Sequence, residues 1–128
     1  MADSGSSRGL LRAELGELLW VAVGAVPGAL LRWQVSLQLV DRNVLVNAFG
    51  AALLGWLAGA APSARRQLLL GVGFCGSLTT FSSWMLDTAR LLGEGHWGAA
   101  LGLLALTLGL GLGGGLLGYQ LGTRFSRA

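Results

Sequence analysis

Long apolar runs, separated by turn residues and arginines, dominate the chain. Four of them predict membrane-spanning helices at about 16–39, 43–61, 67–92 and 96–120. At a rise of about 1.5 Å per residue, each can cross a hydrocarbon core of about 30 Å. The connections are short, so consecutive helices are expected to be antiparallel neighbours. The pattern therefore predicts an all-α integral membrane protein with four transmembrane helices.

The two ends of the chain differ from these spans. Residues 1–14 are mostly small, polar or charged and predict an N-terminal tail, and residues 125–128 predict a C-terminal tail. The four-helix transmembrane domain is then expected over 15–124. A signal peptide is the alternative for the first apolar run, but no clear small-x-small cleavage site precedes a soluble domain.

Composition supports the membrane interpretation. The 128 residues are enough for one domain, and 53% are hydrophobic while 12% are charged. A soluble domain of this size cannot bury so much apolar surface. The 22 glycines suit membrane helices that pack closely. In the fourth span, the pairs Gly111/Gly115 and Gly114/Gly118 have the small-xxx-small spacing of such contacts.

The basic residues are nine arginines and no lysine, and the net charge is +3. They are scattered between apolar runs, so they indicate interfacial anchors and topology signals rather than a nucleic-acid surface. Four spans place both termini on one side of the membrane. That side holds Arg8, Arg12, Arg65, Arg66, Arg124 and Arg127, and the other holds Arg32, Arg42 and Arg90. This bias weakly favours termini inside and leaves insertion in both orientations open.

The third span is unusually polar and glycine-rich between Gly73 and Trp84. Gly73 and Gly76 weaken the helix, and the nearby hydroxyl groups compete for its backbone hydrogen bonds. A break at Gly76–Thr79 would free carbonyl oxygens near the bilayer midplane, where they must line water, be buried in protein or hold an ion. Hard cations such as Na⁺ prefer oxygen ligands.

The same span offers groups that suit a small anion. Phe81 and Trp84 share a helix face, and the edge of an aromatic ring is positive. Thr79, Ser82 and Ser83 add hydroxyl donors. The alternative is that the aromatic residues fill space and the hydroxyls bond to the preceding turn.

Three further polar positions are candidates. Asn47 presents two amide donors inside an apolar span, although an interhelical hydrogen bond explains it equally well. Arg32 would either attract anions into a vestibule or extend to the headgroups. Asp87 and Arg90 are three residues apart and are expected to pair.

Residues 73–84, GFCGSLTTFSSW, resemble the signature of the CrcB/Fluc fluoride channels, G-F-x-G-G-x-T-T-F-S-T-F. Two other segments agree in order and spacing. They are G-x-x-x-G-A-x-x-R over residues 24–32 and V-N-x-x-G over residues 46–50, followed by Gly55. The resemblance covers about residues 20–122.

The resemblance implies a fluoride-selective passive channel that exports fluoride across the bacterial plasma membrane and protects the cell against its toxicity. It also implies an antiparallel, dual-topology dimer with a structural Na⁺ at its centre. The backbone carbonyls of Gly76 and Thr79 would hold Na⁺. The fluoride pathway would be formed by Asn47, Phe81, Trp84, Thr80, Ser82, Ser83 and Thr107, with Arg32 beside a vestibule.

This sequence departs from the family pattern at three points. Ser77 replaces the second glycine, Trp84 replaces the second phenylalanine, and Thr107 is nearly the only hydroxyl of the fourth span. Some members pair two unlike chains, so a homodimer and a heterodimer with a paralogous chain are both open. A non-conducting subunit of such a heterodimer is one alternative function.

A small dual-topology multidrug exporter is the other alternative. It would need an acidic residue deep in the first helix, whereas Glu14 and Glu17 precede the apolar run. An enzyme is disfavoured because Cys75, His96 and Asp87 lack the partners of a catalytic triad and no nucleotide-binding loop is present.

Overall fold

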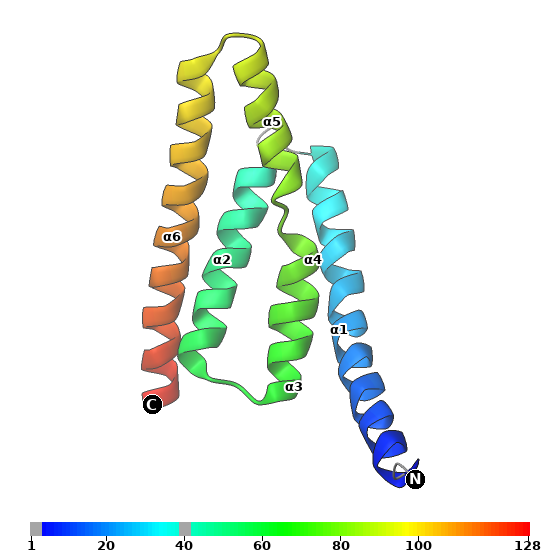
Figure 1. The fold of residues 1–128 in the computed structure, drawn as a ribbon. Coiled ribbons are helices and arrows are strands. Elements are labelled where there is room, and N and C mark those ends of the chain that lie inside the picture. The colour runs from blue at the N-terminus through cyan, green and yellow to red at the C-terminus, as the bar shows by residue number, and fades with distance from the viewer. Residues whose placement is uncertain (1–3, 39–41) are drawn as a thin grey trace.

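Four long helical spans make up the protein (Figure 1). The structure is a computed structural model that describes residues 4–38 and 42–128. The first, second and fourth spans are α1 (Ser4–Gln38), α2 (Arg42–Ala60) and α6 (Trp97–Arg127). The third is composite and consists of α3 (Ala64–Arg66), the π-helix η1 (Gln67–Cys75), α4 (Gly76–Leu78) and α5 (Ser82–Gly93). All four spans are long and apolar enough to cross a membrane, which confirms that prediction.

The spans are arranged in a row rather than a closed bundle. Figure 1 shows the order α6, α2, third span and α1, with both termini and the α2–α3 turn at one end. Along the third span the main neighbour changes, because η1 and α4 pack on α1 whereas α5 packs on α6. The third span therefore crosses from one outer helix towards the other.

Helical structure extends beyond the predicted spans at both ends of the chain. α1 begins at Ser4, so residues 4–14 are helical although the sequence predicts a tail there, and α6 continues to Arg127. Leu10, Leu11 and Leu15 favour helix, and no proline occurs before Pro27. The 35 residues of α1 measure about 52 Å, so α1 is longer than a hydrocarbon core is thick. Residues 1–3 of the predicted tail and residue 39 of the first predicted span lie outside the described residues.

Glycines of α6 bring this helix into backbone contact with α2, as their spacing predicts. A Cβ added at Gly118 would overlap the carbonyl oxygen of Ala52, and one added at Gly55 would overlap that of Gly115. Gly114 lies against the Ala48 carbonyl. Gly111 is the exception, because a Cβ there would have no neighbour within 4 Å.

The interruption of the third span begins at Thr79, the last residue of the predicted break Gly76–Thr79, and extends beyond it to residue 81. Gly76 is helical, with φ −62° and ψ −36°. Helical geometry ends after Leu78, since Thr79 is extended with φ −79° and ψ 155°, and α5 begins at Ser82. Residues 79–81 are called the linker below. The position of the linker follows from its contacts with α2.

Candidate functional site

A side-chain amide of α2 holds the middle of the linker. Asn47 Nδ2–H donates to the Thr80 carbonyl oxygen at 2.8 Å, and the Thr80 N–H donates to Asn47 Oδ1 at 2.8 Å. Both backbone polar groups of Thr80 are thereby satisfied without a helix, as a buried backbone requires. One N–H of the amide is not used in this pair.

The hydroxyl groups of the linker bind in two directions. Thr79 Oγ1–H donates back to the Cys75 carbonyl at 2.9 Å, and the Thr79 N–H donates to the same carbonyl at 3.0 Å. Thr80 Oγ1 accepts from the Ser83 N–H at 3.4 Å, as the side chain of an N-cap residue does, and donates to Ser83 Oγ at 3.0 Å. The Thr79 side chain thus binds back to the preceding helical segment, and the Thr80 side chain binds forward to the first turn of α5.

Gly50 lets the linker approach α2. A Cβ at Gly50 would overlap Cγ2 of Thr79, so a larger residue would push the linker away. Gly50 lies one turn after Asn47 and therefore on the same face of α2. Asn47 supplies the hydrogen bonds of this contact, and Gly50 supplies the space.

The two aromatic residues meet edge to face. The ring centroids of Phe81 and Trp84 are 5.5 Å apart, and the ring planes make an angle of 82°. Their surroundings differ, because Phe81 is 71% exposed and Trp84 only 7%. Thr88 supports Trp84 by donating its hydroxyl to the Trp84 carbonyl at 2.8 Å. Phe81 therefore presents its ring on the outer surface of the chain, beside a buried indole.

These groups border a common cavity of about 350 Å³ between α2, the linker and α6. Its polar lining residues are Asn47, Thr79, Thr80 and Thr107, and the remaining lining residues are the two aromatic residues, Phe81 and Trp84, and Ala51, Leu54, Leu108 and Gly111. We call it the amide cavity. None of its lining residues carries a charge. Within the part of the chain that the structure describes, Thr107 Oγ1 is the only buried side-chain nitrogen or oxygen without a hydrogen-bond partner. A buried hydroxyl of this kind is suited to a guest in the cavity.

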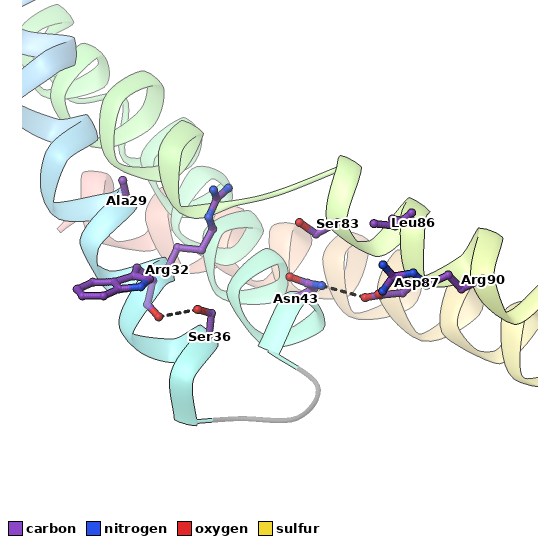
Figure 2. Close-up of a pocket in the computed structure, with 9 residues that line it drawn as sticks. Ala29, Arg32, Ser36, Asn43, Ser83, Leu86, Asp87 and Arg90 are labelled. Carbon is purple, nitrogen blue, oxygen red and sulfur yellow. Dashed lines mark hydrogen bonds between the residues drawn. The ribbon is translucent and has the colours of Figure 1, made fainter.

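A second cavity of about 390 Å³ lies between α1, the start of α2 and α5 (Figure 2). We call it the arginine cavity, because Arg32 and Arg90 both line it. Asn43 and Asp87 lie side by side in its lining, and Asn43 Nδ2–H donates to Asp87 Oδ2 at 3.1 Å. Electrostatically, this cavity combines two guanidinium groups with one carboxylate.

The predicted ion pair between Asp87 and Arg90 is wrong. The structure records no ion pair between the Asp87 carboxylate and the Arg90 guanidinium, and Asp87 instead accepts a hydrogen bond from Asn43. The cause is the amide of Asn43, which gives the Asp87 carboxylate a partner on α2. Arg90 therefore lines the arginine cavity together with Arg32. This role of Arg90 was not predicted from the sequence. The signal was available, since Ser83, Asp87 and Arg90 share one face of α5.

The two cavities meet at a pair of hydroxyl groups. Ser83 lines the arginine cavity and Thr80 lines the amide cavity, and these hydroxyls are hydrogen-bonded at 3.0 Å. Seven of the eight predicted anion-pathway residues line one cavity or the other. Ser82 is the eighth: it is exposed and borders neither.

The two predicted cation ligands lie at the end of the first half of the span. Gly76 is exposed, and Thr79 is partly buried beside the amide cavity. In a continuous helix, the Thr80 N–H would bond to the Gly76 carbonyl, but here it bonds to Asn47. The Gly76 carbonyl therefore lacks its usual helical donor.

The sequence was compared with known proteins. Residues 19–119 match the family described as CrcB-like protein, Camphor Resistance (CrcB). A Parasynechococcus marenigrum (strain WH8102) protein named fluoride-specific ion channel FluC 2 is 66% identical over 115 residues, covering 90% of this chain and 87% of that relative.

A protein of Prochlorococcus marinus carries the name fluoride-specific ion channel FluC 1. It is 41% identical over 95 residues, which cover 74% of this chain and 73% of that relative. The family match covers most of the chain, and it includes the linker and both cavities. The chain belongs to the CrcB-like family, which the relatives' names identify with the FluC channels.

Proposed function

We propose that this chain forms a fluoride-selective passive channel that exports fluoride across the bacterial plasma membrane and protects the cell against fluoride toxicity. The amide cavity carries the proposal, because it gathers amide, hydroxyl and aromatic groups around an unpartnered buried hydroxyl. The names of the relatives, fluoride-specific ion channels, support the choice of anion.

The chemistry of the amide cavity suits fluoride. A pore must replace the water around this small, strongly hydrated anion with donors. The unused N–H of Asn47 and the hydroxyl of Thr107 are such donors. Ring edges of Phe81 and Trp84 add positive electrostatic potential without a fixed charge. A site without a cationic side chain can hold an anion weakly enough to release it, which conduction requires.

The arginine cavity would serve as a vestibule. Arg32 and Arg90 raise the local concentration of anions, and the effect weakens as salt screens their charge. The hydroxyl pair of Thr80 and Ser83 then offers a polar route to the amide cavity.

The driving force needs no transport cycle. Hydrogen fluoride is a weak acid, so its neutral form crosses the bilayer and dissociates inside. An inside-negative potential drives the anion out with about 2.3 kcal/mol per 100 mV. A passive pore is therefore sufficient for protection.

A second chain would complete the site. Phe81 and Gly76 are exposed, so one side of the linker region is open in the single protomer. We propose an antiparallel dimer, with either an identical chain or a paralogue as the partner. The arginine bias between the two membrane faces and the paired names FluC 1 and FluC 2 among the relatives favour a paralogue. In that case this chain is either a conducting partner or a non-conducting one.

A structural Na⁺ belongs to this proposal. The carbonyls of Gly76 and Thr79 are oxygen ligands of the kind that hard cations prefer, and the Gly76 carbonyl lacks the Thr80 donor. The ion would supply a positive charge that joins two chains through backbone oxygens.

Fluoride efflux from liposomes tests the function. Liposomes with the purified chain should lose fluoride and retain chloride, and Asn47→Asp should suppress the flux because a carboxylate repels the anion. The absence of a fluoride-selective leak, both for this chain alone and together with a paralogue, would refute the channel. Full activity of Asn47→Asp would remove Asn47 from the pathway.

A further inference from the structure

The linker redirects two backbone donors, and each redirection affects a different carbonyl oxygen. In a continuous α-helix, the Thr80 N–H would bond to the Gly76 carbonyl, and the Ser83 N–H would bond to the Thr79 carbonyl. The structure pairs the first donor with Asn47 Oδ1 at 2.8 Å and the second with Thr80 Oγ1 at 3.4 Å. The carbonyls that lose these donors are the two proposed Na⁺ ligands.

We infer that Asn47 and Thr80 are positioning residues for the cation site, because their side chains take the N–H groups that would otherwise occupy its carbonyl oxygens. The inference rests on the sodium part of the proposed function and extends it. Asn47 then has two separate tasks. Its Oδ1 accepts from Thr80 and leaves the Gly76 carbonyl without that donor, while its amide also lines the amide cavity and has one N–H that Thr80 does not use.

The geometry explains why side chains and not water perform this exchange. Thr80 is buried, with an exposed fraction of 8%, so its N–H must bond within the protein. Without Asn47 Oδ1, the acceptor that a continuous α-helix would give this N–H is the Gly76 carbonyl, one turn back. Removing that oxygen atom should therefore extend the helix and occupy the carbonyl. Thr80 Oγ1 has the same relation to the Ser83 N–H and the Thr79 carbonyl.

Two isosteric pairs of variants separate positioning from general damage. Asn47→Leu removes the acceptor, whereas Asn47→Asp keeps an oxygen in its place. Thr80→Val removes the hydroxyl, whereas Thr80→Ser keeps it. Thr107→Val is the control, because Thr107 lines the same cavity but binds none of the redirected groups.

The measurement is the rise in melting temperature of the purified protein in detergent when N-methylglucamine chloride is replaced by sodium chloride at equal concentration. Native protein, Asn47→Asp, Thr80→Ser and Thr107→Val should show the sodium-dependent rise, and Asn47→Leu and Thr80→Val should lose it. Fluoride flux should fall in Asn47→Asp although its sodium response persists. A merely structural role of Asn47 would not produce that separation.

Two results would overturn the inference. If Asn47→Leu and Thr80→Val respond to sodium as the native protein does, the redirected donors have no bearing on the cation and only the inference fails. If the native protein itself shows no sodium response, the sodium proposal fails as well, while fluoride efflux still tests the channel separately. Should Asn47→Leu not fold, Thr80→Val carries the test, because it replaces one hydroxyl by a methyl group.

Discussion

The two halves of the third span are held in place by different kinds of contact. The first half, η1 and α4, packs on α1 through glycines of both helices. A Cβ at Gly24 would overlap the Leu69 carbonyl, and one at Gly73 would overlap the Val21 carbonyl. The linker and the second half, α5, are tied to α2 by two amides: Asn47 binds Thr80 of the linker, and Asn43 binds Asp87 of α5. One half is fixed by backbone shape, and the other by side-chain donors and acceptors.

The glycine contacts and the amide contacts therefore have different roles, the first in packing and the second in hydrogen bonding. Glycine contacts bring backbones together by van der Waals packing and present no side-chain polar group to a ligand. The amide contacts satisfy the linker and still leave an N–H of Asn47 available at the amide cavity. The first half can therefore serve as a fixed support for the linker and α5, which carry most of the proposed anion pathway.

Gly24→Val should have the largest effect, because it disrupts the glycine-mediated packing of α1 on η1. The new Cβ would overlap backbone atoms of η1, which cannot rotate away, so the cost exceeds the roughly 1–3 kcal/mol of ordinary overpacking. We expect loss of monodisperse protein in detergent chromatography. Gly16→Val on the same helix is the matched control, because a Cβ there meets nothing within 4 Å. Equal yields for the two variants would contradict the support role.

Thr107→Val should reduce function without reducing stability. The hydroxyl is buried and unpartnered, and such a group costs about 1–3 kcal/mol, so its removal should leave the melting temperature unchanged or raise it. Fluoride flux should fall about tenfold, which corresponds to about 1.4 kcal/mol in the barrier. Liposome efflux and a thermal melt on the same preparation measure both effects. A lower melting temperature with unchanged flux would assign Thr107 to packing alone.

Ser77→Gly should have the smallest effect, although it restores the family's glycine. Ser77 is helical, donates its hydroxyl to the Phe74 carbonyl at 3.1 Å and occupies the space beside Gly28 of α1. It thus belongs to the supporting half. We expect a loss of about 1 kcal/mol or less in the free energy of unfolding and unchanged flux. A large gain in flux would instead show that Ser77 affects conduction directly.

The sequence was most informative where one physical quantity dominates. Hydropathy predicts the four spans, since length and apolar content alone decide whether a helix can cross a membrane. The glycine spacing of the fourth span predicts close packing on another helix for the same reason, because only a small residue admits another backbone; the partner, α2, was not predicted. All the predicted anion-pathway residues except Ser82 border the amide or arginine cavity.

The sequence was less informative where tertiary partners compete with local preference. The interruption begins at Thr79 and not at Gly76, because Asn47 lies opposite Thr80 on another helix. Asp87 binds Asn43 rather than Arg90, and their separation of 44 residues hides that choice from any local pattern. The π-helix Gln67–Cys75 was not predicted, because a helix of either type suits the same apolar residues.

Because Phe81 is exposed, channel activity should depend on how dilute the protein is in the bilayer. Phe81 lines the amide cavity and is 71% exposed, so the cavity wall on this side is open to whatever lies against the chain. If a second chain supplies that wall, then function follows two-dimensional mass action, as in any assembly that has no complete unit below the dimer. Leak per protein would then fall as the lipid-to-protein ratio rises, and the ratio at half-maximal leak would report the dissociation constant within the bilayer.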